Sequence, residues 1–206
     1  MSDLVAELPD EPRWLEAHGL AADPASWRHP LGAGLALGND AAGLIVIVGD
    51  ADPTVLAALA RARPAHTLLV AIEREDLARA TGRGVVRARL HTLPADALDA
   101  LPDLEGAVAL PADAALDHVP PALAAELGHA RAHRTIWTAF VDGAPVSFAY
   151  APWRSARWFD VSVDTLAGAR QLGLGRLVAI AMIRDEVAHG RAPVWGANDD
   201  NIASLR

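Results

Sequence analysis

The sequence predicts an α/β fold, in which an N-terminal α/β region precedes a mixed, largely antiparallel sheet flanked by helices. Two observations predict this fold. In the N-terminal half, short runs of apolar, β-branched residues alternate with segments of helical composition. In the C-terminal half, an alternating hairpin leads into a third strand, a glycine-bearing loop and an apolar helix. A sheet must bury its apolar face against another element, so these helices are expected to cover it.

In the N-terminal half, residues 1–40 are expected to be irregular apart from a short helix near residues 12–19. The apolar run Leu44–Val48 lies between glycines and predicts a buried strand. Asp52 and Pro53 provide an N-cap and a first helical position for the segment that follows. The remaining expected elements are helices over 54–63 and 74–80 and strands over 67–72 and 85–90.

Two features of this half bear on its organisation. Gly32-Ala33-Gly34 with Gly38 imitates a dinucleotide-binding fingerprint, but it precedes the buried strand instead of following it, so it predicts no nucleotide site. Prolines recur between Pro94 and Pro121, which predicts a linker region with a short strand at 108–110. The expected division is therefore an N-terminal region over residues 1–115 and a C-terminal domain over residues 116–206.

The C-terminal half begins with a helix expected over 121–130, on which Glu126, His129 and His133 share roughly one face. A solvated polar face is the simpler interpretation of these three residues, and a catalytic face is the alternative. Asp142-Gly143 then predicts a hairpin turn. The remaining expected elements are strands over 135–141, 145–150, 158–163 and 193–197, a helix from Leu177 to about Ala188 with Gly190 after it, a turn over 198–201 and the first turn of a helix over 202–206.

Composition excludes several classes of function. There is no cysteine, which excludes thiolate metal sites and a cysteine nucleophile, and we expect no metal site. All 18 cationic residues are arginine, which excludes a phosphate-binding lysine or a Schiff base. The net charge is −8 without any basic run, so nucleic acid is not an expected partner. No apolar stretch is long enough to span a membrane, and a cytoplasmic location is expected.

The loop between the last predicted strand and its helix is a candidate anion site. The first N–H groups of a helix have no acceptor inside it, and the helix dipole favours negative charge there. Gly173 and Gly175 allow the backbone to turn tightly before the helix and to approach a ligand. Glycine-bearing turns before helices are common, so this pattern alone is weakly specific.

The hexamer Arg170-Gln171-Leu172-Gly173-Leu174-Gly175 resembles the pyrophosphate loop of the GNAT superfamily of acyl-CoA-dependent N-acetyltransferases. The order of hairpin, strand, loop, helix, strand and Asn201-to-Ser204 helix start is also similar to that family, over about residues 134–206. Short phrases such as those at residues 143–148, 160–165 and 193–197 are similar to a bacterial branch. The resemblance implies the GNAT fold and acetyl-CoA as co-substrate.

It also implies roles for particular residues. Main-chain groups of Val161, Ser162 and Val163 would bind the pantetheine arm of the coenzyme as an added strand. Backbone N–H groups from Gln171 through Gly173, Leu174 and Gly175 to Arg176 would hold the pyrophosphate, and the Arg170 and Arg176 side chains would add charge. Solvent exposure is the alternative for both arginines. Asn201 would contact the ligand or act only as an N-cap.

The implied reaction is direct attack of an amine on the thioester. An amine of pKa ~10 must lose a proton near pH 7, which costs about 4 kcal/mol and calls for a general base. Candidates are Asp160 and Asp164, which strand alternation places on one face with Ser162, and then Glu126 and His129. A capping role is the alternative for Asp164. Tyr150 is the only tyrosine, and the family's usual acid would lie beyond the end of this chain.

Two departures from the family pattern qualify the resemblance. Val163 lies two residues further from Arg170 than usual, so the loop is longer. The family's final helix normally continues beyond the position of Arg206 and is followed by further strands, which would leave the strand at 193–197 with an unpaired edge here. Either the chain is a fragment, or the N-terminal half or a partner such as a second copy in a homodimer covers that edge. The acceptor is expected to be a small-molecule or protein amine.

The alternative function is a GNAT-like module that binds CoA or a partner without catalysis. A third interpretation takes the N-terminal half as a partner-binding or second, degenerate GNAT-like domain. Enzyme and binding module differ in whether CoA thiol is released in the presence of an amine.

Overall fold

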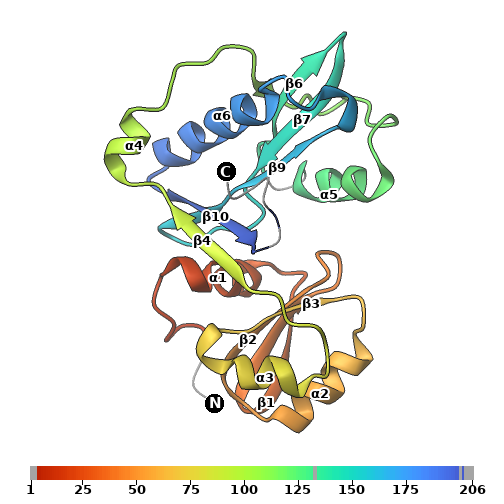
Figure 1. Ribbon diagram of the computed structural model, residues 1–206, viewed down its shortest axis with the longest axis vertical. Coiled ribbons are helices and arrows are strands. Elements are labelled where there is room, and N and C mark those ends of the chain that lie inside the picture. The colour runs from red at the N-terminus through yellow and green to blue at the C-terminus, as the bar shows by residue number, and fades with distance from the viewer. Residues whose placement is uncertain (1–3, 132–133, 200, 202–206) are drawn as a thin grey trace. The chain divides into compact units, whose positions relative to one another are not determined.

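The computed structural model (Figure 1) describes residues 4–131, 134–199 and 201. They form two compact units. The described residues of Met1–Arg89 and Ala197–Arg206 make unit 1, and those of Leu90–Gly196 make unit 2. These compact units do not test whether residues 1–115 and 116–206 are separate domains. The division after residue 115 therefore stays a prediction.

Unit 1 is built on a three-stranded sheet in the order β1-β2-β3. β1 and β2 are antiparallel, and β3 is parallel to β2. Its strands are β1 (Trp27–Asn39), β2 (Leu44–Ala51) and β3 (Thr67–Leu69), and its helices are η1 (Pro12–Trp14), α1 (Leu15–Ala22), α2 (Pro53–Ala62), η2 (Ile72–Arg74) and α3 (Glu75–Ala80).

The prediction that residues 1–40 are irregular is wrong, because Trp27–Asn39 is the longest strand of the described chain. The glycines in this segment lower its strand propensity, so the sequence did not indicate a strand. A Cβ at Gly34 would lie 2.7 Å from the Ala51 nitrogen, and one at Gly38 would lie 2.1 Å from the Trp27 ring. These positions therefore need glycine so that backbone and indole can pack closely within the sheet. The same spacing that imitates a nucleotide fingerprint serves packing instead.

The ends of α2 follow the sequence prediction. The Asp52 carboxylate accepts hydrogen bonds from the Thr54 nitrogen at 2.7 Å and the Val55 nitrogen at 3.3 Å. Pro53 takes the first helical position, where a missing N–H has no consequence. At the other end, the Arg83 guanidinium donates to the His66 carbonyl oxygen at 2.6 Å and also to carbonyl groups of the helix end.

Unit 2 contains two sheets, in the orders β4-β10-β8 and β5-β6-β7-β9. β4 begins in the last residues of unit 1, and β10 ends in the first residues after unit 2. The strands are β4 (Ala88–Thr92), β5 (Val108–Ala109), β6 (Trp137–Val141), β7 (Ala144–Tyr150), β8 (Trp158–Asp160), β9 (Ser162–Thr165) and β10 (Ala192–Asn198), and the helices are α4 (Ala95–Asp99), α5 (Pro121–Arg131), η3 (Ala167–Ala169) and α6 (Leu174–Ala188).

Two helices cover opposite faces of the larger sheet, as the alternation of β7 requires. Phe148 and Tyr150 pack with Leu127 of α5, whereas Ala149 belongs to the cluster that includes Met182 of α6. The predicted turn between β6 and β7 is confirmed, since Asp142 and Gly143 both have positive φ, 51° and 80°. Figure 1 shows α5 and α6 on the two sides of these strands.

Three predicted strands differ from the observed ones. The β-branched pair Val85 and Val86 is exposed and precedes β4, which begins at Ala88 and pairs within the sheet of β10. The strand predicted over 67–72 ends at Leu69, and η2 follows. The strand predicted over 158–163 is divided at Val161 into β8 and β9.

The edge of β10 that was expected to lack a partner is paired with β4. Of the alternatives that the sequence left open, the chain's own N-terminal half therefore provides the cover. β10 is central to its sheet, and a second copy is not needed to protect that edge.

Candidate functional site

The strand that runs from Trp158 to Thr165 changes partner halfway along. β8 pairs in parallel with β10 as far as Asp160 and Val194, and the Val161 nitrogen then donates to the Val194 carbonyl oxygen at 3.0 Å. From Ser162 onward, β9 pairs with β7 instead, and within the described chain it is the last strand of its sheet. Figure 1 shows β9 beside β7 while β10 turns away. A gap between the two ladders therefore opens after Val161.

Alternation along the strand decides which main-chain groups face this gap. The carbonyl of Asp164 points to β7, where the Ser147 hydroxyl approaches it at 3.4 Å. Because N–H and C=O groups alternate between the two edges of a strand, those of Ser162 also face β7, whereas those of Val163 face the gap with Val161. The Val161 N–H is already bonded to β10, so Val163 is the residue whose main chain remains for an extended ligand.

The predicted anion loop follows β9 after the short helix η3. Gln171 and Gly173 adopt positive φ values of 66° and 76°, and α6 begins at Leu174 with Gly173 as its N-cap. No side chain caps this helix within the described chain, and its first turn carries no acidic residue. The Leu177 nitrogen makes the first intrahelical bond, to the Gly173 oxygen at 3.1 Å. The N–H groups before it have no acceptor inside the helix and suit an anion.

The two loop glycines serve different purposes. A Cβ at Gly173 would meet no atom within 4 Å, so the residue is needed only for its left-handed backbone. Gly175, predicted to be part of the loop, lies in the first turn of α6. There a Cβ would lie 3.2 Å from the Thr165 hydroxyl oxygen and 3.6 Å from a Val163 methyl carbon. Gly175 therefore lets the start of α6 pack closely on β9.

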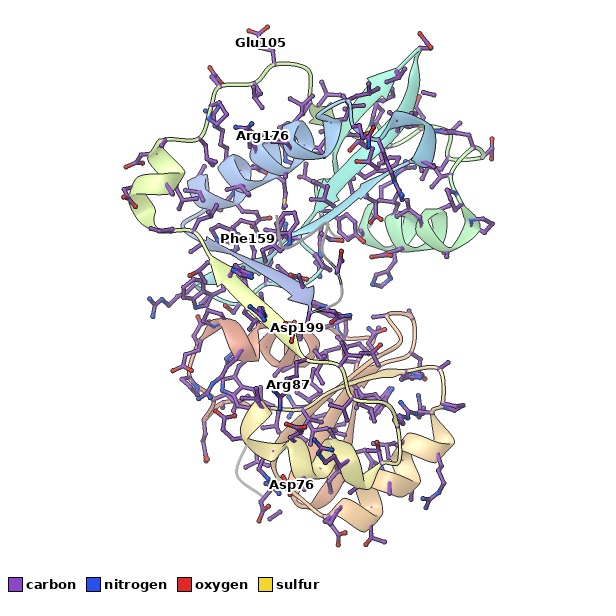
Figure 2. The ribbon with its side chains drawn as sticks, viewed as in Figure 1. Asp76, Arg87, Glu105, Phe159, Arg176 and Asp199 are labelled. Carbon is purple, nitrogen blue, oxygen red and sulfur yellow. The ribbon has the colours of Figure 1, made fainter. Side chains whose placement is uncertain are left out.

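The two loop arginines are exposed. The Nε of Arg170 donates to the Thr165 carbonyl oxygen at 3.2 Å, which attaches this side chain to the end of β9. Arg176 lies on the first turn of α6 and forms no ion pair with any described residue. Figure 2 shows Arg176 on α6. Both guanidinium groups thus stay available to a ligand at the helix start.

Two of the four candidate bases, Asp164 and Glu126, come together on the face opposite α6. His129 is an exposed residue of α5. The Tyr150 hydroxyl donates a hydrogen bond to Oε1 of Glu126, on α5. Tyr150 lies directly across from Ser162, and Phe148 lies across from Asp164, so Ser162 and Asp164 share the face that packs on α5. Asp160, the remaining candidate, lies before the break at Val161, on the segment that pairs with β10.

The environment of this cluster changes its proton affinity. Burial raises the pKa of the Asp164 carboxyl above its ordinary value; the negative charge of Glu126 raises it further, and Arg170 opposes both. Burial and the bond to Glu126 raise the pKa of Tyr150, so its phenol stays protonated at neutral pH. Tyr150 was not among the site residues predicted from the sequence. The available signal was a lone tyrosine on an apolar strand, whose hydroxyl needs a partner when buried.

Asn201 lies in unit 1, whereas the loop and the divided strand lie in unit 2. It is exposed, and its backbone nitrogen donates to the Asn198 oxygen at 2.9 Å, which is the predicted turn. The helix predicted to follow it, with Ser204, lies outside the described residues. Among residues 4–131, 134–199 and 201, no group of histidine and acidic side chains could hold a metal ion, and no helix is long and apolar enough to cross a bilayer.

Comparisons with known proteins place this geometry among known folds. No family model matches the sequence, and no curated protein matches it. Among solved structures, a GCN5-related N-acetyltransferase-like protein from Streptococcus suis is 17% identical with a TM-score of 0.61, and the match covers 98% of this chain and 88% of that one. A GNAT-family protein from Novosphingobium aromaticivorans is 18% identical with a TM-score of 0.53, covering 96% and 88%.

A tandem GNAT protein from the clavulanic acid biosynthesis pathway is also similar, at 14% identity and a TM-score of 0.52, with 94% of this chain and 89% of that one covered. These matches extend over nearly the whole chain, whereas the sequence motifs that carry the resemblance lie within its last third. At such low identity they establish architecture. The divided strand, the uncapped helix start and these structural likenesses together show that the chain has the GNAT fold.

Proposed function

We propose that this protein is an N-acetyltransferase that moves an acetyl group from acetyl-CoA to an amine. The observation that carries the proposal is the gap after Val161, which exposes the main chain of Val163 beside the uncapped start of α6. An extended arm that ends in a diphosphate matches these two features, because one offers strand pairing and the other offers N–H donors.

The residues present fit such a ligand. The N–H groups of Leu174, Gly175 and Arg176 would hold a diphosphate, and the Arg170 and Arg176 side chains would add positive charge beside it. Hydrogen bonds to charged groups are worth about 1.5–3 kcal/mol each, so three of them are sufficient for firm binding. Acetyl-CoA would supply the activated thioester, and Val163 would orient the arm that carries it.

Asp164 is the best-placed general base. A carboxylate whose pKa is raised takes a proton from an ammonium group more readily than an ordinary one, and Asp164 lies on the sheet face that carries Tyr150 of β7 and packs on α5, the helix of Glu126. Glu126 is exposed and would attract the cationic form of an amine, either of a small molecule or of a protein. Tyr150 keeps its proton at neutral pH and would hold Glu126 in position.

The binding step is tested by titration of acetyl-CoA with the melting temperature as the readout. Acetyl-CoA is expected to stabilise the wild-type protein. Arg176→Glu should weaken binding at least tenfold, because a carboxylate in the first turn of α6 would occupy or repel the anion position. Arg157→Glu makes the same change of charge on an exposed residue of unit 2 and is the matched control. No stabilisation by millimolar acetyl-CoA contradicts the proposal.

Turnover is tested by release of free CoA thiol in the presence of a panel of primary amines. An enzyme releases thiol in proportion to added amine, and Asp164→Asn should reduce the rate while acetyl-CoA affinity is retained. Binding without thiol release for any amine would instead support the alternative of a non-catalytic CoA-binding module.

We also propose that unit 1 is a second, degenerate GNAT-like unit. In unit 1, antiparallel β1 and β2 are followed by α2 and by β3, which returns parallel to β2. In unit 2, antiparallel β7 and β9 are followed by α6 and by β10, which returns parallel to β8. The likeness to a tandem GNAT protein over 94% of this chain supports this interpretation.

A further inference from the structure

The segment of unit 1 that contains Val85 and Val86 has the composition of a strand but no strand partner. Both residues are β-branched and apolar, yet both are exposed, Val86 to 60%. The main-chain groups of Gly84, Val85 and Val86 form no hydrogen bond with any residue that the structure describes. At the next residue the chain is paired, because the Arg87 oxygen accepts from the Asp199 nitrogen at 2.9 Å, and β4 follows. Free main-chain groups beside a paired strand can accept an added strand.

The two valines line an open groove of about 810 Å³. Clefts that hold ligands have volumes of about 300–1,000 Å³, so the groove is large enough for an occupant. Its other lining residues belong to unit 1 and are mostly charged: Glu75, Arg79, Gly82, Arg83, Arg87 and Asp199. Arg87 and Asp199 are labelled in Figure 2. The proposed acetyl-CoA site lies in unit 2, and the groove is not part of it.

Guanidinium groups outnumber carboxylates around this groove. The Glu75 carboxylate accepts from Arg79 at 2.5 Å and from Arg87 at 2.9 Å, so two cations share one anion. Asp199, the other carboxylate of the lining, pairs with Arg89 at 2.6 Å. The two carboxylates are therefore already used, and they do not neutralise all of the arginines.

The arginines also keep donors for a partner. The side chains of Arg79 and Arg87 are 71% and 61% exposed, so their remaining N–H groups face solvent. Arg83 donates only to main-chain oxygens, including that of His66 at 2.6 Å, and has no carboxylate partner among the described residues. Because the whole chain carries a net charge of −8, this excess of cations is a local reversal that favours an anionic partner.

We propose that this groove binds an extended acidic segment of another protein. The segment would pair through its main chain with residues 84–86 and through its carboxylates with Arg79 and Arg87. Strand pairing supplies hydrogen bonds that are independent of sequence, and alternate side chains supply the complementary charge. A second copy of this chain is disfavoured as the occupant, because two such segments would bring arginines together. The proposal does not depend on acetyltransferase activity.

Three fluorescein-labelled heptapeptides test this proposal by fluorescence anisotropy. The first alternates Glu and Val, the second replaces each Glu with Lys, and the third keeps the acidic sequence but carries N-methyl groups on its main-chain nitrogens. The unmodified acidic peptide should bind at least tenfold more tightly than either of the others, because only it offers both carboxylates and N–H donors. Added salt should weaken its binding.

Arg87→Glu should weaken binding of the acidic peptide at least tenfold. Arg61→Glu makes the same change of charge on an exposed residue of α2 and should leave binding unchanged. Arg176→Glu should also bind the peptide as the wild type does, which separates this result from any loss of acetyl-CoA binding.

The proposal is overturned if the acidic peptide shows no saturable binding in the millimolar range, or if either control peptide binds as tightly. Equal affinity of Arg87→Glu and Arg61→Glu for the acidic peptide would also overturn it. Self-association of the wild-type protein that the acidic peptide reverses would assign the groove to a second copy of this chain instead.

Discussion

Replacing Gly173 with alanine is expected to destabilise unit 2 by about 1–2 kcal/mol. Gly173 has φ of 76°, in the left-handed region that costs a residue with a Cβ about that much. A Cβ at this position would meet nothing within 4 Å, so no steric term adds to the conformational one. In a chain of this size, about 2–4 °C accompanies each kcal/mol, which predicts a fall in melting temperature of about 2–8 °C.

Two control substitutions isolate the backbone effect. Gly168 also lies in open space, but its φ is not in the left-handed region, so Gly168→Ala should be neutral or slightly stabilising. Gln171 has φ of 66° and carries a side chain. Gln171→Gly should therefore relieve backbone strain at this position and cause almost no loss of stability relative to the wild type.

The assay is urea denaturation followed by both tryptophan fluorescence and circular dichroism, with acetyl-CoA titration of each variant. Gly173→Ala should also bind acetyl-CoA more weakly, because the turn at this residue directs the N–H groups of α6. Equal stability of Gly173→Ala and Gly168→Ala would refute the reasoning that a left-handed turn sets the start of this helix.

Further substitutions test the acidic cluster and the core. Because burial raises the pKa of Asp164, the folded state holds its proton more strongly than the unfolded chain, so this residue's contribution to stability falls as pH rises from about 4 through the raised pKa. The melting temperature of Asp164→Asn minus that of the wild type should therefore be more positive at pH 7 than at pH 3.5. Melting curves across this pH range are the check. The same variant should lose about 10²–10⁴-fold in kcat, as measured by thiol release, if Asp164 is the base; an unchanged kcat would assign that role elsewhere. Tyr150→Phe should leave acetyl-CoA affinity unchanged but raise KM for the amine, because Glu126 loses the hydroxyl that positions it; an unchanged KM would make this bond purely structural. Glu186 is buried and pairs with Arg154 and Arg191, so Glu186→Ala should cost about 3–5 kcal/mol in urea denaturation without changing acetyl-CoA affinity of the folded protein.

The sequence predicted the C-terminal half better than the N-terminal half, for physical reasons. The hairpin at Asp142 and the helix that ends before Gly190 depend on local turn chemistry, which can be interpreted within a few residues. β1 could not be predicted in this way. Gly34 and Gly38 lower the strand propensity of this segment. Glycine is required at these positions only because Ala51 and Trp27 approach them closely in the folded sheet.

The candidate site was predictable in part. The loop from Arg170 to Arg176 and its helix follow from glycine spacing. The break at Val161 could not be predicted from local sequence, because it depends on where β10 stops pairing with the strand of residues 158–165. Val161 itself is an ordinary apolar strand residue. Likewise, nothing local indicates that the lone Tyr150 reaches Glu126 on a helix more than twenty positions earlier in the chain.

The two crossings of the chain between the units have a practical consequence. Unit 2 comes from one uninterrupted stretch, whereas unit 1 draws on both ends of the chain. Asp199 is held to the first part of unit 1 by an ion pair with Arg89 at 2.6 Å and by its N–H bond to the Arg87 oxygen at 2.9 Å. A single protease nick near residue 90 would therefore yield fragments that co-migrate on a native gel and separate only in denaturant. In the sequence, unit 2 is an insertion between the two segments of unit 1, so its release as a separate fragment requires cleavage at both of its ends.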